Sequence, residues 1–107
     1  YSSAASDVYK RQEAAQWACY TVGELARGSP SNRERLLACG ACECAVDALT
    51  RWGAGSDDAA RDGCYAVYCL AKDDPALKSR LLRVGAVEAV RGARENSYQT
   101  RALDALA

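Results

Sequence analysis

An internal repeat constrains the fold of this chain more than any other feature of its sequence. Cys19-Tyr20 recurs 45 residues later as Cys64-Tyr65. In the same register, Arg35-Leu36-Leu37 recurs as Arg80-Leu81-Leu82, and no gap interrupts the alignment between the two matches. Periods of about 40 to 47 residues are typical of arrays of stacked helical units, which bury their apolar faces against their neighbours. The repeat therefore predicts an all-α fold.

Helix-capping signals divide the two copies at equivalent places. Ser31 and Glu34 have the spacing of a capping box, in which the two side chains satisfy free backbone N–H groups of the first turn. Gly40 follows as a residue that can close a helix in the left-handed conformation. In the second copy, Asp74-Pro75 supplies an acidic cap with proline at the first helical position, and Gly85 closes the helix. Each copy is therefore predicted to contain a short first helix and then a second helix.

A longer third helix is predicted from apolar residues at spacings of four, three and four. The stripe occurs twice, as Ala15, Cys19, Val22 and Ala26 and again as Ala60, Cys64, Val67 and Ala71. The final segment, ALDALA, matches AVYCLA at an offset of only 36, so the turn before the last helix is nine residues shorter. We expect the third helix of one repeat at 13–27, a full repeat at 31–72 and a shortened repeat at 75–107.

Composition removes several functional classes. The chain has 14 basic and 14 acidic residues, so its charge favours neither a nucleic-acid partner nor an anionic membrane. Histidine is absent, which excludes Ser-His and Cys-His nucleophiles and histidine-ligated zinc. No apolar run approaches the roughly 18 to 20 residues of a membrane span. Six cysteines without a secretory signal indicate a reducing, intracellular location, which we expect to be the cytoplasm, with the nucleus as an open alternative.

The first twelve residues, YSSAASDVYKRQ, differ from the rest of the chain. They carry no helical apolar stripe, and they precede an alanine-rich pattern that begins at Glu13. The run resembles a translated sequencing-library adapter tail, and a native flexible terminus is the alternative. We therefore expect residues 1–12 to be a non-native or disordered tail and residues 13–107 to form the repeat domain, as a fragment of a longer protein.

The repeats resemble those of the armadillo-repeat family. The resemblance rests on NRERLLACGACECAVDAL and LKSRLLRVGAVEAV, above all on their shared Leu-Leu-x-x-Gly-Ala-x-Glu pattern, and on helices such as EAAQWACYTVGELA. It covers residues 13–107. The resemblance implies an armadillo-like right-handed α-solenoid of stacked three-helix repeats that binds proteins along a concave face lined by the third helices. It implies a protein-interaction scaffold without a cofactor, and not an enzyme.

The third helices carry the candidate contact residues for a partner. On their faces away from the core lie Tyr20, Glu24, Arg61, Tyr65, Tyr68 and Arg101. Exposed tyrosine beside arginine offers a large contact area at low entropic cost, and the cation can pair with carboxylates. We therefore expect an extended peptide or a partner helix to bind here. Alternatively, Tyr65 and Tyr68 cover the junction between adjacent repeats. Self-association through the uncapped ends is a further expectation.

Three cysteines within six residues, Cys39, Cys42 and Cys44, raise the alternative of a thiol or zinc module. In the second copy their places are taken by Val84, Val87 and Ala89. Positions that accept cysteine, valine and alanine are apolar packing positions, where cysteine acts as a small hydrophobe. A zinc site would need a fourth ligand. The CxxC spacing of Cys39 and Cys42 leaves a redox role open.

The remaining cysteines and the two tryptophans complete the sequence-based expectations. Cys19 and Cys64 lie in the apolar stripe and are expected to be buried, whereas Cys69 lies opposite the stripe and is expected to be an exposed, reactive thiol. Trp17 and Trp52 are expected to be packing residues. A third functional hypothesis makes the chain the repeat arm of a larger enzyme, such as a ubiquitin ligase or a kinase, whose catalytic domain lies outside this sequence.

Overall fold

The computed structural model describes the backbone of residues 2–107, and this part of the chain consists of helices joined by short turns. The helices are α1 (Ser2–Gly28), α2 (Pro30–Ala38), α3 (Ala41–Trp52), α4 (Asp57–Ala71), α5 (Pro75–Arg83), α6 (Ala86–Gly92) and α7 (Gln99–Leu106). The prediction of an all-α fold is thus confirmed. None of the described helices combines the length and the apolar character that crossing a membrane requires.

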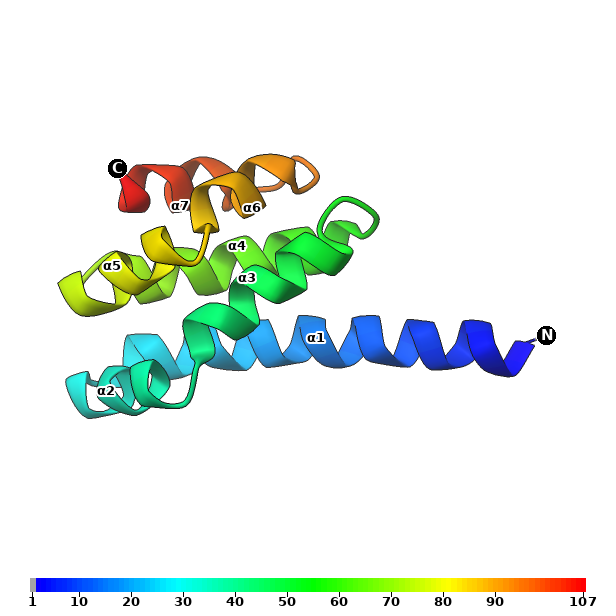
Figure 1. The fold of residues 1–107 in the computed structure, drawn as a ribbon, viewed down its shortest axis with the longest axis horizontal. Helices are drawn as coiled ribbons and strands as arrows, with labels where there is room; N and C mark the ends of the chain where they lie inside the picture. Colours follow the sequence, from blue (N-terminus) through cyan, green and yellow to red (C-terminus); the bar gives the residue numbers. More distant parts are fainter. Residues whose placement is uncertain (1) are drawn as a thin grey trace.

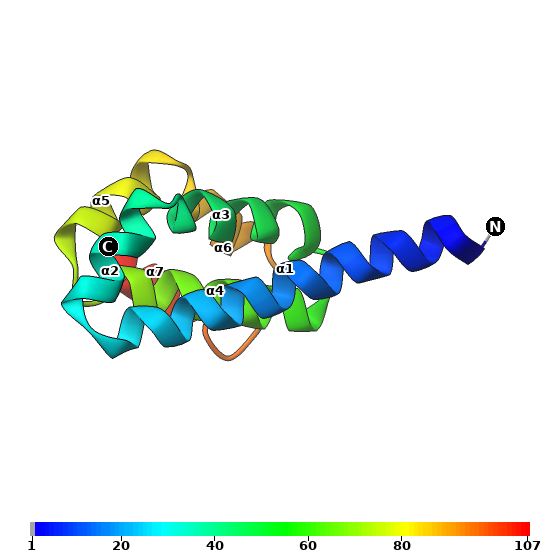
Figure 2. The same cartoon turned by 90° about the horizontal axis from the view of Figure 1, so that it is seen from below.

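The helices form two layers. Helices α1, α4 and α7 lie side by side and run in the same direction (Figure 1). Helices α3 and α6 form the second layer, and the short helices α2 and α5 lie together at one end of the molecule (Figure 2). Helix α4 occupies the centre, because it contacts α1, α3, α5, α6 and α7. The helices expected as third helices of the repeats therefore share one face of the protein.

The helix ends follow the capping chemistry of the sequence, with one correction. Helix α2 begins at Pro30, and its cap is Ser29, whose hydroxyl accepts a hydrogen bond from the Asn32 backbone N–H at 3.1 Å. The predicted cap at Ser31 is wrong, since proline fits the first helical position and so places the cap one residue before itself. The equivalent cap, Asp74 before Pro75, is confirmed.

Two glycines make the corner between the first and second helices of each repeat. Gly40 has a φ of 83° and Gly85 has a φ of 92°, which is the left-handed region that other residues rarely adopt. Both follow the end of a short helix and come immediately before the next helix. The prediction of left-handed glycines at these two corners is confirmed.

Helix α1 is longer than the sequence pattern indicated. It begins at Ser2 instead of Glu13, and the segment between them contains neither glycine nor proline to stop the helix. The side chains of residues 4–11 are all exposed, and this half of α1 projects beyond the other helices (Figure 1). The projecting half packs against no other helix. This arrangement does not test the origin of residues 1–12 as an adapter tail, which stays a prediction.

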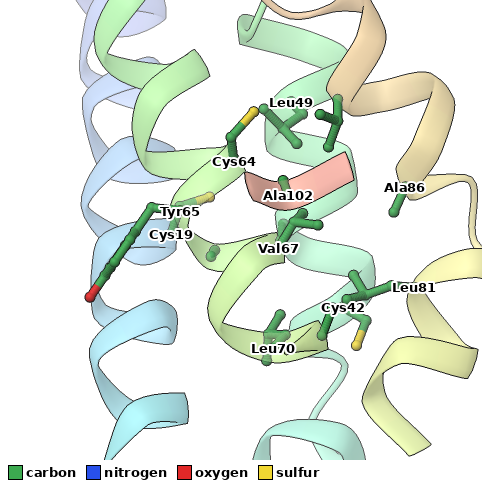
Figure 3. Packing of buried hydrophobic residues seen from close by; sticks show 14 of the residues in the cluster. Cys19, Cys42, Leu49, Cys64, Tyr65, Val67, Leu70, Leu81, Ala86 and Ala102 are labelled. Atoms are coloured by element: carbon green, nitrogen blue, oxygen red, sulfur yellow. The ribbon is translucent and has the colours of Figure 1, made fainter. Parts of the chain in front are cut away.

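A core of small and medium-sized side chains fills the space between the layers (Figure 3). Its largest fully buried side chains include Leu49, Leu70, Leu77 and Leu81, which come from α3, α4 and α5. Cys19 and Cys64 belong to the same cluster, as predicted from the apolar stripe. The repeat pattern thus identified much of the interior, because equivalent residues of the two copies both belong to the core between the two layers.

Candidate functional site

A row of aromatic side chains crosses the face formed by α1, α4 and α7. This aromatic row consists of Trp17, Tyr20, Tyr65, Tyr98 and Tyr68. The Tyr20 and Tyr65 rings are stacked, with centroids 6.0 Å apart and planes inclined at 24°. Tyr65 then meets Tyr98 edge to face at 4.9 Å. Since offset and edge-to-face aromatic contacts are favourable, the row ties the three helices together as well as forming a surface.

The Tyr65 ring lies over α1 because Gly23 leaves room for it. A Cβ atom on Gly23 would come within 2.5 Å of the Tyr65 ring. Only 8% of Tyr65 is exposed, so the expectation that this ring faces solvent is wrong. Figure 3 shows the Tyr65 side chain directed along α1, away from the core side chains between the layers. Its position matches the alternative interpretation, in which tyrosine covers the junction between repeats.

Hydrogen bonds fix the Tyr65 hydroxyl in this junction. The hydroxyl donates to the Glu24 carboxylate and accepts a hydrogen bond from Arg27 Nη1 at 3.2 Å. Burial raises the pKa of Tyr65, and the hydrogen bond to Glu24 raises it further. The phenol therefore stays protonated and remains a donor. Glu24, predicted as a contact residue, thus has a structural partner on α4.

A second polar contact joins α1 to α4 beside the aromatic row. Asp62 is only 6% exposed, and its carboxylate accepts hydrogen bonds from Gln16 Nε2 at 3.0 Å and from Arg61 Nε at 3.2 Å. Arg61 also bonds to Asp58 at 3.1 Å. These contacts satisfy a carboxylate that would be costly to bury alone. No local sequence pattern indicates this contact, because Gln16 and Asp62 are 46 residues apart.

The exposed parts of the face combine aromatic and cationic groups. Tyr20 is 42% exposed, and Tyr68 is half-buried. Arg101 is exposed and lies 5.3 Å from the centroid of the Tyr98 ring, while Lys72 lies 5.4 Å from that of Tyr68. Between α1, α4 and Tyr98, the face is hollowed by an open pocket of about 360 Å³. Its lining residues are Tyr20, Glu24, Arg27, Arg61, Asp62, Tyr65 and Tyr98.

The structure brings most of the predicted contact residues to one surface. Tyr20, Glu24, Arg61 and Tyr65 line the pocket, and Arg101 joins them through its contact with Tyr98. Tyr98 was missed by the sequence analysis, because it lies in the shortened turn before α7 and outside the repeat alignment. Gly23 and Tyr98 together position Tyr65. Of these two residues, only Gly23 carries a signal in the sequence, because it is a small residue within a predicted third helix.

The three clustered cysteines do not converge on a common point. Cys42 is buried and its thiol donates to the Leu77 carbonyl at 3.7 Å, whereas Cys39 and Cys44 are exposed. Within residues 2–107, no group of three or more Cys, Asp or Glu side chains is arranged to hold a metal ion. Burial raises the pKa of the Cys42 thiol to about 11, which keeps it protonated near neutral pH. The geometry therefore supports packing for Cys42.

Two other expectations about single residues are wrong. Cys69 is buried, because the aromatic row and α1 cover the side of α4 that the apolar stripe leaves free. Trp17 is 56% exposed and contacts the edge of Tyr20 at a centroid distance of 6.1 Å. It lies on the outer helix α1, where no further layer covers it. Trp52 is half-buried at the end of α3.

Thiol reactivity should follow this pattern of exposure. With the folded, reduced protein at neutral pH, we expect Cys39 and Cys44 to react with a chromogenic disulfide reagent before the other four thiols, although partial burial raises the pKa of Cys44 and slows its reaction. The buried thiols of Cys19, Cys42, Cys64 and Cys69 should react only after denaturant is added. Mass spectrometry of partially labelled protein would identify the modified residues. Rapid labelling of Cys69 would contradict the burial of that side of α4.

Comparisons of this chain with protein-family models, with curated proteins and with solved structures found no match.

Proposed function

We propose that this chain is an armadillo-like right-handed α-solenoid that acts as a protein-interaction scaffold. An extended peptide or a partner helix would bind along the face of α1, α4 and α7. The observation that carries the proposal is the aromatic row with its exposed cations, which continues across all three helices. Further support comes from the 45-residue repeat and from the parallel arrangement of the three helices.

The contact residues divide into two groups under this proposal. Tyr20, Tyr68 and Arg101 would contact the partner directly, since part of each side chain reaches solvent. Tyr65, Glu24 and Arg61 would hold the surface in shape, the first two through their mutual hydrogen bond and Arg61 through its bonds to Asp62 and Asp58. Aromatic and arginine side chains contribute most of the binding energy at many interfaces, because they bury large areas and pair with carboxylates. An acidic or aromatic side chain of the peptide would fit next to Arg101 and Tyr20.

A displayed random-peptide library selected on the immobilised chain tests the proposal. We expect selected peptides whose dissociation constants rise by about tenfold or more in the double variant Tyr20→Ala/Arg101→Ala. Arg61 is left in place, because its removal would deprive the buried Asp62 carboxylate of a hydrogen-bonding partner. Fluorescence anisotropy with labelled peptides would provide the dissociation constants.

The matched control is the double variant Tyr9→Ala/Arg91→Ala. It removes the same two types of side chain from exposed positions on α1 and α6, outside the aromatic row. Binding should change by less than about twofold in this control. Peptides that bind Tyr20→Ala/Arg101→Ala as tightly as the wild type would show that the proposed surface is not the binding site.

A further inference from the structure

The groove between α1 and α2 is the repeat equivalent of the groove between α4 and α5, which α3 fills. Helices α4 and α5 are the 45-residue equivalents of α1 and α2. Helix α3 packs against both α4 and α5. The equivalent of α3 one repeat earlier would lie against α1 and α2. Within the described chain, no helix occupies that place. The filled groove therefore shows what chemistry the open groove can accept.

In the filled groove, α3 is held by a charged contact and by apolar packing. Arg80 of α5 donates from Nε to Glu43 Oε2 of α3 at 2.8 Å. Hydrogen bonding to Arg80 lowers the pKa of Glu43, so the carboxylate is ionised at neutral pH. Leu70 of α4 and Leu81 of α5 are fully buried, and Figure 3 shows Leu81 next to Cys42 of α3. Each of these groove residues has a 45-residue equivalent at the open groove.

The open groove presents the same side chains without an occupant. Arg35 is the equivalent of Arg80, is exposed, and forms no ion pair within residues 2–107. Leu25 is the equivalent of Leu70 and is 45% exposed, although Leu70 is 0% exposed. Arg35, Leu25 and Leu36 line one apolar pocket of about 290 Å³ together with Asn32 and Cys39. Asn32 replaces the equivalent Leu77 and donates to the Leu25 carbonyl at 3.2 Å.

We propose that the groove between α1 and α2 is a second docking site, which takes an amphipathic helix carrying a glutamate in its first turn. The glutamate pairs with Arg35, and the small apolar residues of the helix cover Leu25. Leu36 lines the same pocket and is already buried, at 6% exposed. The choice of occupant follows from charge complementarity and from the contact that α3 makes one repeat later. This pocket shares no lining residue with the pocket beside the aromatic row, so the inference does not rest on the proposed function.

A synthetic peptide with the sequence of residues 40–53 is the probe, because it contains α3 and its Glu43. The binding is measured by NMR titration of the full ¹⁵N-labelled chain under reducing conditions. We expect shifts to concentrate at Leu25, Arg35 and Leu36. Arg35→Glu should raise the dissociation constant by about tenfold or more, since it places like charges together. A peptide with Glu43→Arg should restore binding to the Arg35→Glu chain.

Arg91→Glu is the control, because it makes the same charge reversal on α6, which packs against α3, α4, α5 and α7. This variant should bind the peptide as the wild type does. The proposal is overturned if the wild-type chain does not bind the peptide. It is also overturned if Arg35→Glu binds unchanged, which would indicate that the peptide displaces the chain's own α3 from the filled groove.

Discussion

Replacing Leu70 with alanine is expected to lower the free energy of unfolding by about 3 to 5 kcal/mol. Leu70 is 0% exposed and lies on α4, the helix that contacts most of the others. The truncation removes apolar area from the core and leaves a cavity. The surrounding helices cannot close this cavity fully, because each of them is held in place by its packing against other helices. Urea unfolding followed by circular dichroism measures the loss.

The chain supplies a matched control for this substitution. Leu25 is the residue 45 positions earlier, on the same side of its helix, yet it is 45% exposed. Leu25→Ala should therefore cost less than about 1 kcal/mol. Equal losses in the two variants would mean that α4 is no better covered than α1, and the central position of α4 would then be wrong.

Tyr65→Ala is expected to be the second strongly destabilising substitution, with a loss of about 3 kcal/mol. The ring fills the space over Gly23 and contacts the rings of Tyr20 and Tyr98, so its removal opens the junction of α1, α4 and α7. Thermal unfolding of this variant should be broader or occur at a lower temperature than that of the wild type. Near-ultraviolet circular dichroism should also decrease, because the aromatic row is broken.

Tyr65→Phe separates the ring from its hydroxyl. The ring and its packing remain, while the hydrogen bonds to Glu24 and Arg27 are lost. Both partners reach solvent, so the expected loss is only about 1 kcal/mol. If phenylalanine were as damaging as alanine, the hydroxyl rather than the ring would hold the junction. If neither variant lost stability, Tyr65 would be a surface residue, as the sequence pattern first indicated.

Local sequence patterns predicted the helices themselves better than they predicted which helices pack against one another. Gly40, Gly85 and the Asp74 cap were predicted because each acts within a few residues of itself. The start of α1 was not, since a helix continues until something stops it, and no glycine or proline precedes Gln12. Ser29 was missed because the capping-box pattern at Ser31 competed with the rule that proline follows the cap.

The candidate site was predicted in outline and missed in its contacts. Helical periodicity placed Tyr20 and Tyr65 on one face of neighbouring third helices, and the structure stacks their rings. Periodicity describes one helix at a time, however, and cannot indicate which residue of another helix covers a side chain. The burial of Tyr65 depends on Gly23 in α1 and on Tyr98 in an irregular turn. Asp62 is likewise buried only because Gln16 of α1 reaches it.

The projecting half of α1 makes backbone hydrogen bonds within its own helix, but no neighbouring layer covers them. Isolated helical segments of this length are marginal in water, because nucleating a helix is costly and tertiary packing supplies most of the stability. Amide hydrogens in this half can therefore exchange with solvent whenever the helix end frays. From Ala15 onwards, where α1 packs against α4 and the core, exchange requires α1 to separate from them. A single continuous helix thus contains a steep gradient of protection against hydrogen exchange along its axis.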